Sequence, residues 1–83
     1  MKKSEIERRL AAIIANYTEF DMKNVSQPTT LREDIGLTSF DIISLITEIE
    51  ESFSMNIDDA AILSEIVTFG ETVDFIADVL GAA

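Results

Sequence analysis

Hydroxyl and carboxylate groups supply most of the chemistry that this chain offers, because its 83 residues include no cysteine and no histidine. A catalytic thiolate and the commonest general base are therefore excluded, and the sequence predicts that the protein is not an enzyme. Adjacent acids with no EF-hand spacing predict solvated charge and no metal site. These acidic pairs are Glu33-Asp34, Glu50-Glu51 and Asp58-Asp59.

Ser39, in the stretch GLTSFD, is the best candidate for a reactive hydroxyl. Thr38 and Asp41 fit the pattern [ST]-x-x-[DE], in which Thr38 caps a helix and Asp41 reaches back to it. Ser39 then occupies the first helical position, beside unpaired backbone N–H groups, where its hydroxyl can carry or contact a phosphate. In the alternative reading the box shifts by one residue, and Ser39 is only a cap.

The helix that follows, expected from Thr38 to Phe53, has apolar residues in two directions. The ordinary core stripe, about 100° wide, consists of Ile42, Leu45, Ile46, Ile49 and Phe53. Phe40, Ile43 and Thr47 lie on the far side, flanked by Glu50 and Glu51. An exposed apolar anchor with a charged rim is typical of a partner site. The alternative is that Phe40 folds back under the preceding loop.

The remaining elements also follow from caps and periodicity. Ser4 opens an S-x-x-E box, so a first helix is expected from Ser4 to about Phe20. A long loop at residues 21–37 follows, and three apolar residues are expected to attach it to the core: Val25, Leu31 and Ile35. Asp58 or Asp59 is expected to cap a short helix with Ile62, Leu63 and Ile66. A T-x-x-E box at Thr68 opens a last helix with Val73, Ile76, Val79 and Leu80, stopped by Gly81. With no β alternation, the expected fold is an all-α bundle of three longer helices and one short one.

Composition and charge limit the number of domains, the location and the partners that the protein can have. A chain of 83 residues that is 47% hydrophobic predicts one domain spanning residues 1–83. No apolar run approaches the roughly 18 residues needed to cross a bilayer, and no signal-peptide pattern is present, so we expect a cytoplasmic protein with no membrane insertion. The net charge of −10 excludes nucleic acid as a partner, and residues 31–83 hold twelve acids and a single base, Arg32. This acidic part, with Asp58 and Asp59 among the expected contact residues, predicts docking to basic patches.

The segment LREDIGLTSFDIISLITEIEESFSMNIDD resembles the acyl carrier protein family, whose motif G-x-D-S-L opens an acidic second helix. The resemblance covers nearly the whole chain and implies a four-helix bundle. It implies that Ser39 accepts the 4′-phosphopantetheine group of coenzyme A through a phosphodiester, by action of a phosphopantetheinyl transferase, and that the thiol of this arm carries acyl groups as thioesters. Phe40 and Ile43 match positions that contact partners in the family. The implied partners are that transferase and acyl-loading ligases or synthases with basic docking patches.

The sequence departs from the family pattern near the serine. Thr38 stands where aspartate is usual, Phe40 where leucine is usual, and Ser44 and Thr47 where many members have an acid and a methionine. These departures leave both fatty acid biosynthesis and a specialised pathway, such as polyketide or other secondary biosynthesis, as interpretations. An aminoacyl or peptidyl carrier and an unmodified acidic helical adaptor are the alternatives. The ends of the sequence predict a free-standing carrier, and we expect a monomer.

Overall fold

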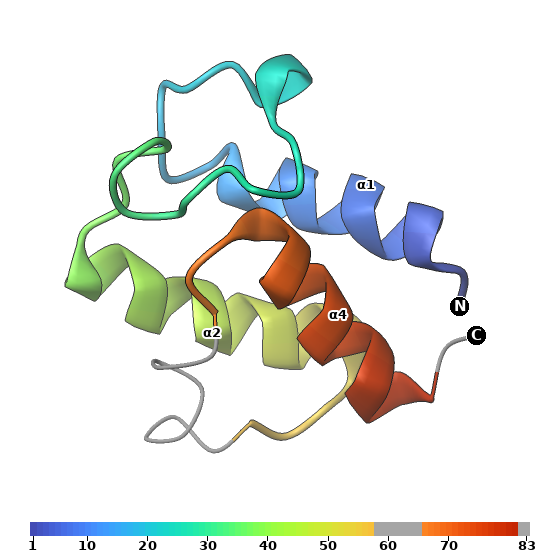
Figure 1. Ribbon diagram of the computed structural model, residues 1–83. Helices are drawn as coiled ribbons and strands as arrows, with labels where there is room; N and C mark the ends of the chain where they lie inside the picture. Colours follow the sequence, from blue (N-terminus) through green and yellow to red (C-terminus); the bar gives the residue numbers. More distant parts are fainter. Residues whose placement is uncertain (58–65, 82–83) are drawn as a thin grey trace.

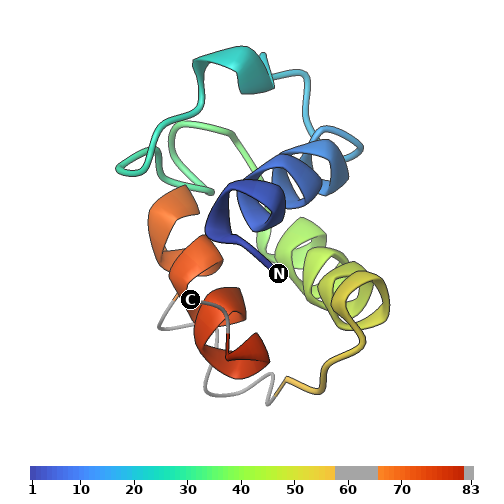
Figure 2. The same ribbon diagram turned by 90° about the vertical axis from the view of Figure 1, so that its right-hand side faces the viewer.

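The computed structural model describes residues 1–57 and 66–81, and these residues form an all-helical fold. Its elements are α1 (Lys3–Ile14), the short 3-10 helix η1 (Met22–Asn24), α2 (Ser39–Phe53) and α4 (Phe69–Leu80). α1 packs against both α2 and α4 (Figures 1 and 2). The expected short helix with Ile62 and Leu63 lies outside the described residues. The only β pairing within them is an isolated bridge between Thr30 and Thr68.

The core is built from the apolar faces of the three longer helices. All five residues of the predicted α2 stripe are buried, from 0% exposed for Leu45 and Ile49 to 5% for Phe53. α1 contributes Ile6, Leu10, Ile13 and Ile14, and α4 contributes Phe69, Val73, Ile76 and Ala77. Val79 lies within α4, as predicted, and is 47% exposed on the last turn of the helix.

α1 differs from the prediction at both ends. It begins at Lys3, with Lys2 as its N-cap and no side-chain cap, so Ser4 lies within the helix and caps nothing. It ends at Ile14 and not near Phe20. Tyr17 continued the apolar spacing because it packs against the core as a partly buried residue beyond the helix end. The apolar spacing that continues to Tyr17 therefore reflects contact with the core and does not mean that the backbone is helical there.

The loop at residues 15–38 is attached to the start of α4 by backbone hydrogen bonds. The N–H of Leu31 donates to the carbonyl of Val67 (3.0 Å), and the N–H of Phe69 donates to the carbonyl of Thr29 (2.8 Å). Gly70 lies so close that an added Cβ would come 3.0 Å from Gln27. Leu31 and Ile35 are buried, and Val25 is partly buried against the core, so their predicted role is confirmed. Figure 1 shows the loop on the side of the molecule where α2 and α4 begin.

α4 begins and ends as its residues predict. Thr68 is the N-cap, with its hydroxyl accepting from the N–H of Glu71 (3.1 Å) while the carboxylate of Glu71 accepts from the N–H of Thr68 (3.0 Å). Gly81 ends the helix with φ of 67°. Within the described ranges, no helix combines the length and hydropathy that crossing a membrane requires.

Candidate functional site

Ser39 is exposed at the first position of α2 and takes no part in its capping. The hydroxyl of Thr38 accepts from the N–H of Asp41 (3.0 Å), and the carboxylate of Asp41 accepts from the N–H of Thr38 (2.9 Å). The predicted capping box is thus confirmed, and the alternative in which Ser39 is itself the cap is wrong. The Ser39 hydroxyl stands at the positive end of the helix dipole, a favourable place for an anion.

A turn fixed by its backbone places Ser39 there. Gly36 has φ of 89°, a conformation that side-chain-bearing residues rarely adopt, and it lets the chain reverse before α2. On either side of this turn, the N–H of Ile35 donates to the carbonyl of Thr30 (3.1 Å), and the N–H of Leu37 donates to the carbonyl of Leu31 (3.0 Å). Leu37 is 2% exposed, so the residues just before Ser39 are anchored in the core.

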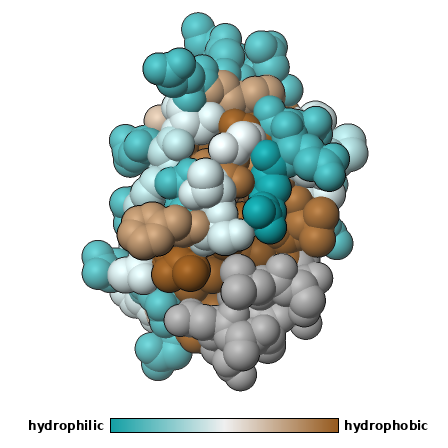
Figure 3. Space-filling model, turned by 90° about the vertical axis from the view of Figure 1, so that its left-hand side faces the viewer, coloured by the Kyte–Doolittle hydropathy of each residue, from teal (hydrophilic) through white to brown (hydrophobic). Residues whose placement is uncertain are grey.

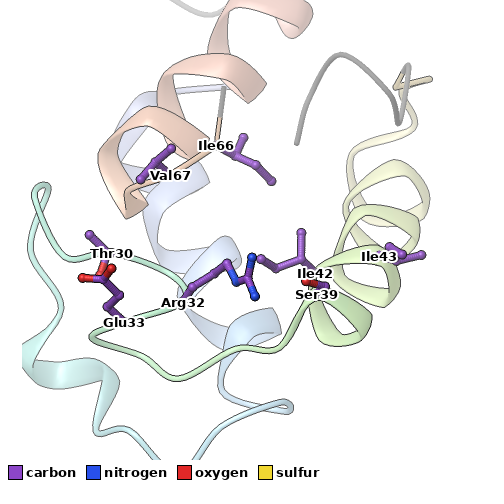
Figure 4. A pocket seen from close by; sticks show the side chains of 8 residues that line it. All are labelled: Thr30, Arg32, Glu33, Ser39, Ile42, Ile43, Ile66 and Val67. Carbon is purple, nitrogen blue, oxygen red and sulfur yellow. The ribbon is translucent and has the colours of Figure 1, made fainter. Parts of the chain in front are cut away.

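A cavity of about 520 Å³ opens beside Ser39 (Figure 4). In the described part of the chain, its walls come from the loop, the first turn of α2 and the chain just before α4. The described residues that line it are Thr30, Arg32, Glu33, Ser39, Ile42, Ile43, Ile66 and Val67. Half of them are apolar, so the site combines an exposed hydroxyl with a hollow that can shelter hydrocarbon.

The outward face of α2 is apolar at its start. Phe40 is 78% exposed and Ile43 is 53% exposed, so the alternative in which Phe40 folds under the loop is wrong. Thr47 and Glu51 are also exposed on the outside of the helix. Figure 3, which shows the side of the molecule where α2 begins, has hydrophobic surface bordered by hydrophilic residues. An exposed apolar surface with a polar border is typical of a site that contacts another protein.

The acids further along α2 have structural partners that the sequence pattern did not indicate. The carboxylate of Glu50 accepts the N–H of Ile57 (3.0 Å) and holds the chain that leaves the helix. Tyr17 donates a hydrogen bond to Glu48, and this bond, together with burial, raises the pKa of Tyr17 to about 12. Glu50 was expected in the charged rim, and its carboxylate is instead engaged in the fold. Asp58 and Asp59 lie outside the described residues.

No group of three or more acidic or other metal-binding side chains comes together in residues 1–57 and 66–81. Of the adjacent pair Glu33-Asp34, the carboxylate of Asp34 accepts the N–H of Thr30 (2.8 Å), while the hydroxyl of Thr30 accepts the N–H of Asp34 (3.0 Å). This reciprocal pair closes the turn before α2, so Asp34 serves the loop that carries the site.

Comparison with known families agrees with this geometry. Residues 8–76 match the family model described as phosphopantetheine attachment site. The chain belongs to the acyl carrier protein family. The cofactor of this family is 4′-phosphopantetheine, and an exposed hydroxyl beside a cavity fits its covalent attachment. The family consists of carriers, so the prediction that this chain is not an enzyme is confirmed by its relatives.

Three relatives illustrate how far this acyl carrier protein likeness extends. The chain is 33% identical to the acyl carrier protein of Rubrobacter xylanophilus, over 94% of this chain and 95% of that protein. It is 32% identical to that of Thermotoga maritima, over 95% of this chain and 96% of the relative. It is 33% identical to the mitochondrial acyl carrier protein of Saccharomyces cerevisiae over 93% of this chain, which spans 64% of the yeast protein.

A solved structure of the acyl carrier protein from Enterococcus faecalis has the same fold. Its TM-score is 0.80, at 24% sequence identity, and the match covers 95% of this chain and 99% of that one. The expected all-α fold is thereby confirmed.

Proposed function

We propose that Ser39 is the residue to which phosphopantetheine is attached, and that the chain carries acyl intermediates of fatty acid biosynthesis. The observation that carries this proposal is the position of Ser39, exposed at the start of α2 and relieved of capping by Thr38, beside a cavity with four apolar lining residues. When bound, the arm supplies a terminal thiol on which acyl groups are held as thioesters.

Each part of the site has a separate task. Thr38 and Asp41 hold the first turn of α2 closed, so that the hydroxyl of Ser39 faces solvent and is accessible to a transferase. The backbone N–H groups of that turn favour the negative charge of a phosphodiester on Ser39. Ile42, Ile43, Ile66 and Val67 form an apolar wall on one side of the cavity beside it.

The cavity favours an acyl cargo over an aminoacyl or peptidyl one. Burial of a hydrocarbon chain among isoleucine and valine side chains is worth about 0.8 kcal/mol per CH₂ group. A charged amino group would lose hydration against this apolar wall. The same argument covers a carrier of a specialised acyl pathway.

Docking would use the outward face of α2. Phe40 and Ile43 supply exposed apolar anchors, with Thr47 and Glu51 beside them on the same helix. The acidic charge of residues 31–83 steers the carrier toward basic patches on the transferase and on ligases or synthases, at modest affinity. We expect this exchange to take place between a monomeric carrier and its partners in the cytoplasm.

The test of attachment is the mass of the intact protein after incubation with coenzyme A, magnesium and a phosphopantetheinyl transferase of broad specificity. We expect a gain of one phosphopantetheine in the wild type and none in Ser39→Ala, with Thr38→Ser as the control that keeps a capping hydroxyl. Loading of Ser39→Ala would remove Ser39 from the site. No loading of any variant by transferases from several carrier systems would favour the unmodified adaptor.

The cargo is tested by loading the wild type from coenzyme A thioesters of increasing chain length. If the cavity shelters the chain, the melting temperature of the loaded protein rises with each added pair of CH₂ groups until the cavity is full. An aminoacyl group of similar size should give no such rise. Equal melting temperatures for all acyl forms would contradict a sheltering role of the cavity.

A further inference from the structure

Arg32 is the only basic residue among residues 31–83, and it lies next to Ser39 in the fold. It lines the cavity together with Ser39, and it also lines an adjoining hollow together with Glu33, Leu37 and Thr38. Figure 4 shows its side chain extending from the loop toward the start of α2. One cation is thus placed at the candidate attachment site of an otherwise acidic region.

The backbone that carries Arg32 is fixed. Leu31, directly before it, is 0% exposed. The N–H of Leu31 donates to Val67 and its carbonyl accepts from Leu37, both at 3.0 Å. A guanidinium on so firmly held a backbone loses less conformational freedom when it binds an anion than one on a mobile loop.

Among the described residues near Arg32, two carboxylates accept hydrogen bonds from the backbone, and a third extends away from Ser39. Asp34 accepts the N–H of Thr30 and Asp41 accepts the N–H of Thr38. In Figure 4 Glu33 extends toward Thr30, away from Ser39. The ion pairs found among residues 1–57 and 66–81 involve Lys3 and Arg8. Figure 4 shows the guanidinium of Arg32 on the side of the cavity where a group attached to Ser39 would lie.

We propose that Arg32 binds the phosphodiester formed at Ser39, and this proposal rests on Ser39 being the attachment residue. The planar guanidinium can donate two hydrogen bonds to the phosphate oxygens, while the N–H groups at the start of α2 face the same anion. Arg32 is thus a positioning residue. By holding the phosphate at the mouth of the cavity, it directs the arm along the apolar wall.

The experiment compares the unmodified and the phosphopantetheine-loaded forms of three proteins: the wild type, Arg32→Gln and Arg8→Gln. Arg8 is the matched control, because its loss changes the net charge equally at an exposed position of α1. Intact mass first establishes that each protein is loaded. The melting temperature and the ³¹P NMR signal of the phosphodiester are then measured for each form, at low and at high salt.

We expect the change of melting temperature on loading to be about 2 °C more favourable in the wild type than in Arg32→Gln, the size that an exposed ion pair gives in a small domain. High salt should remove this difference. The ³¹P signal should shift and narrow in Arg32→Gln, since the phosphate is released, and stay unchanged in Arg8→Gln.

The possible failures are distinguishable. Absence of a mass gain in all three proteins would overturn the attachment proposal and this one with it. A mass gain with equal melting shifts and equal ³¹P signals would overturn the role of Arg32 alone. An effect of Arg32→Gln that appears only when the arm carries a carboxylated group such as malonyl would also overturn it, because the anion bound would then be the cargo.

Discussion

Phe40 and Phe53 lie near the two ends of the same helix, and the structure treats them in opposite ways. Phe53 is 5% exposed and closes the core at the last residue of α2. Phe40, one residue after Ser39, is 78% exposed. The apolar residues on one face of α2 therefore build the core, while those at the start of its outward face are exposed to solvent.

The surroundings of the two rings explain the difference. The guanidinium of Arg9 lies over the Phe53 ring, 4.5 Å from its centroid, and also donates a hydrogen bond to the carbonyl of Ser52. Charge and stacking thus cover the ring on the side that the core leaves open. Phe40 faces away from the core. A large apolar side chain left exposed beside a candidate attachment site is best explained by a partner that covers it.

The comparison is tested most directly by truncating each ring. Phe53→Ala should lower the free energy of unfolding by about 3 kcal/mol or more, because it leaves a cavity in the core. Phe40→Ala should change it by no more than about 0.5 kcal/mol, as expected for an exposed position. Urea unfolding followed by circular dichroism measures both. Similar losses in the two variants would show that Phe40 belongs to the core.

Docking provides the converse test. Phe40→Ser should lower kcat/KM for loading by the transferase by about tenfold, or about 1.4 kcal/mol of docking energy, with an unchanged melting temperature. Val79→Ser is the matched control, since Val79 is 47% exposed at the far end of α4. If both variants load at the same rate as the wild type, the outward face of α2 is not the docking surface for this enzyme.

Substitutions at the neighbouring residues Thr38 and Ser39 should affect different properties. One should lower stability, and the other should abolish attachment. Thr38→Ala removes the cap and should cost about 1 kcal/mol of stability while leaving Ser39 able to be loaded. Ser39→Ala should leave the stability nearly unchanged and abolish loading. Thermal unfolding and intact mass together decide this. A larger stability loss for Ser39→Ala than for Thr38→Ala would contradict the cap assignment.

The smallest effect concerns Tyr17 and Glu48, which join the loop to the side of α2. The pKa of Tyr17 is raised from 10.0 to about 12 in the folded protein. The hydrogen bond to Glu48 therefore contributes fully to stability below pH 10, and this contribution is lost as the pH rises toward 12. Tyr17 is the only tyrosine, so near-ultraviolet phenolate absorbance reports it alone. Glu48→Gln should lower its pKa. Titration of the wild type near pH 10 would show that the bond is not formed in solution.

Local patterns predicted much of the fold for a physical reason. The two capping boxes at Thr38 and Thr68 and the buried stripe of α2 depend on residues within one or two helical turns, whose spacing the sequence records directly. The box at Ser4 was misleading because the end of α1 is exposed to water, which can satisfy its N–H groups without a side-chain cap. Similarly, the spacing through Tyr17 recorded burial beyond the helix end.

The sequence by itself determined that a capping box opens a helix near Ser39 and that Phe40 and Ile43 lie off its core stripe, while the structure decided that Thr38 is the cap and that Phe40 is exposed. Only the tertiary structure decided that Arg32 extends toward Ser39, that Tyr17 binds Glu48, and that a cavity opens between the loop, α2 and the chain before α4. The first set depends on helical periodicity, which is local. The second depends on how far the loop folds back, which is fixed by hydrogen bonds between residues that are distant in the chain, such as Leu31 and Val67.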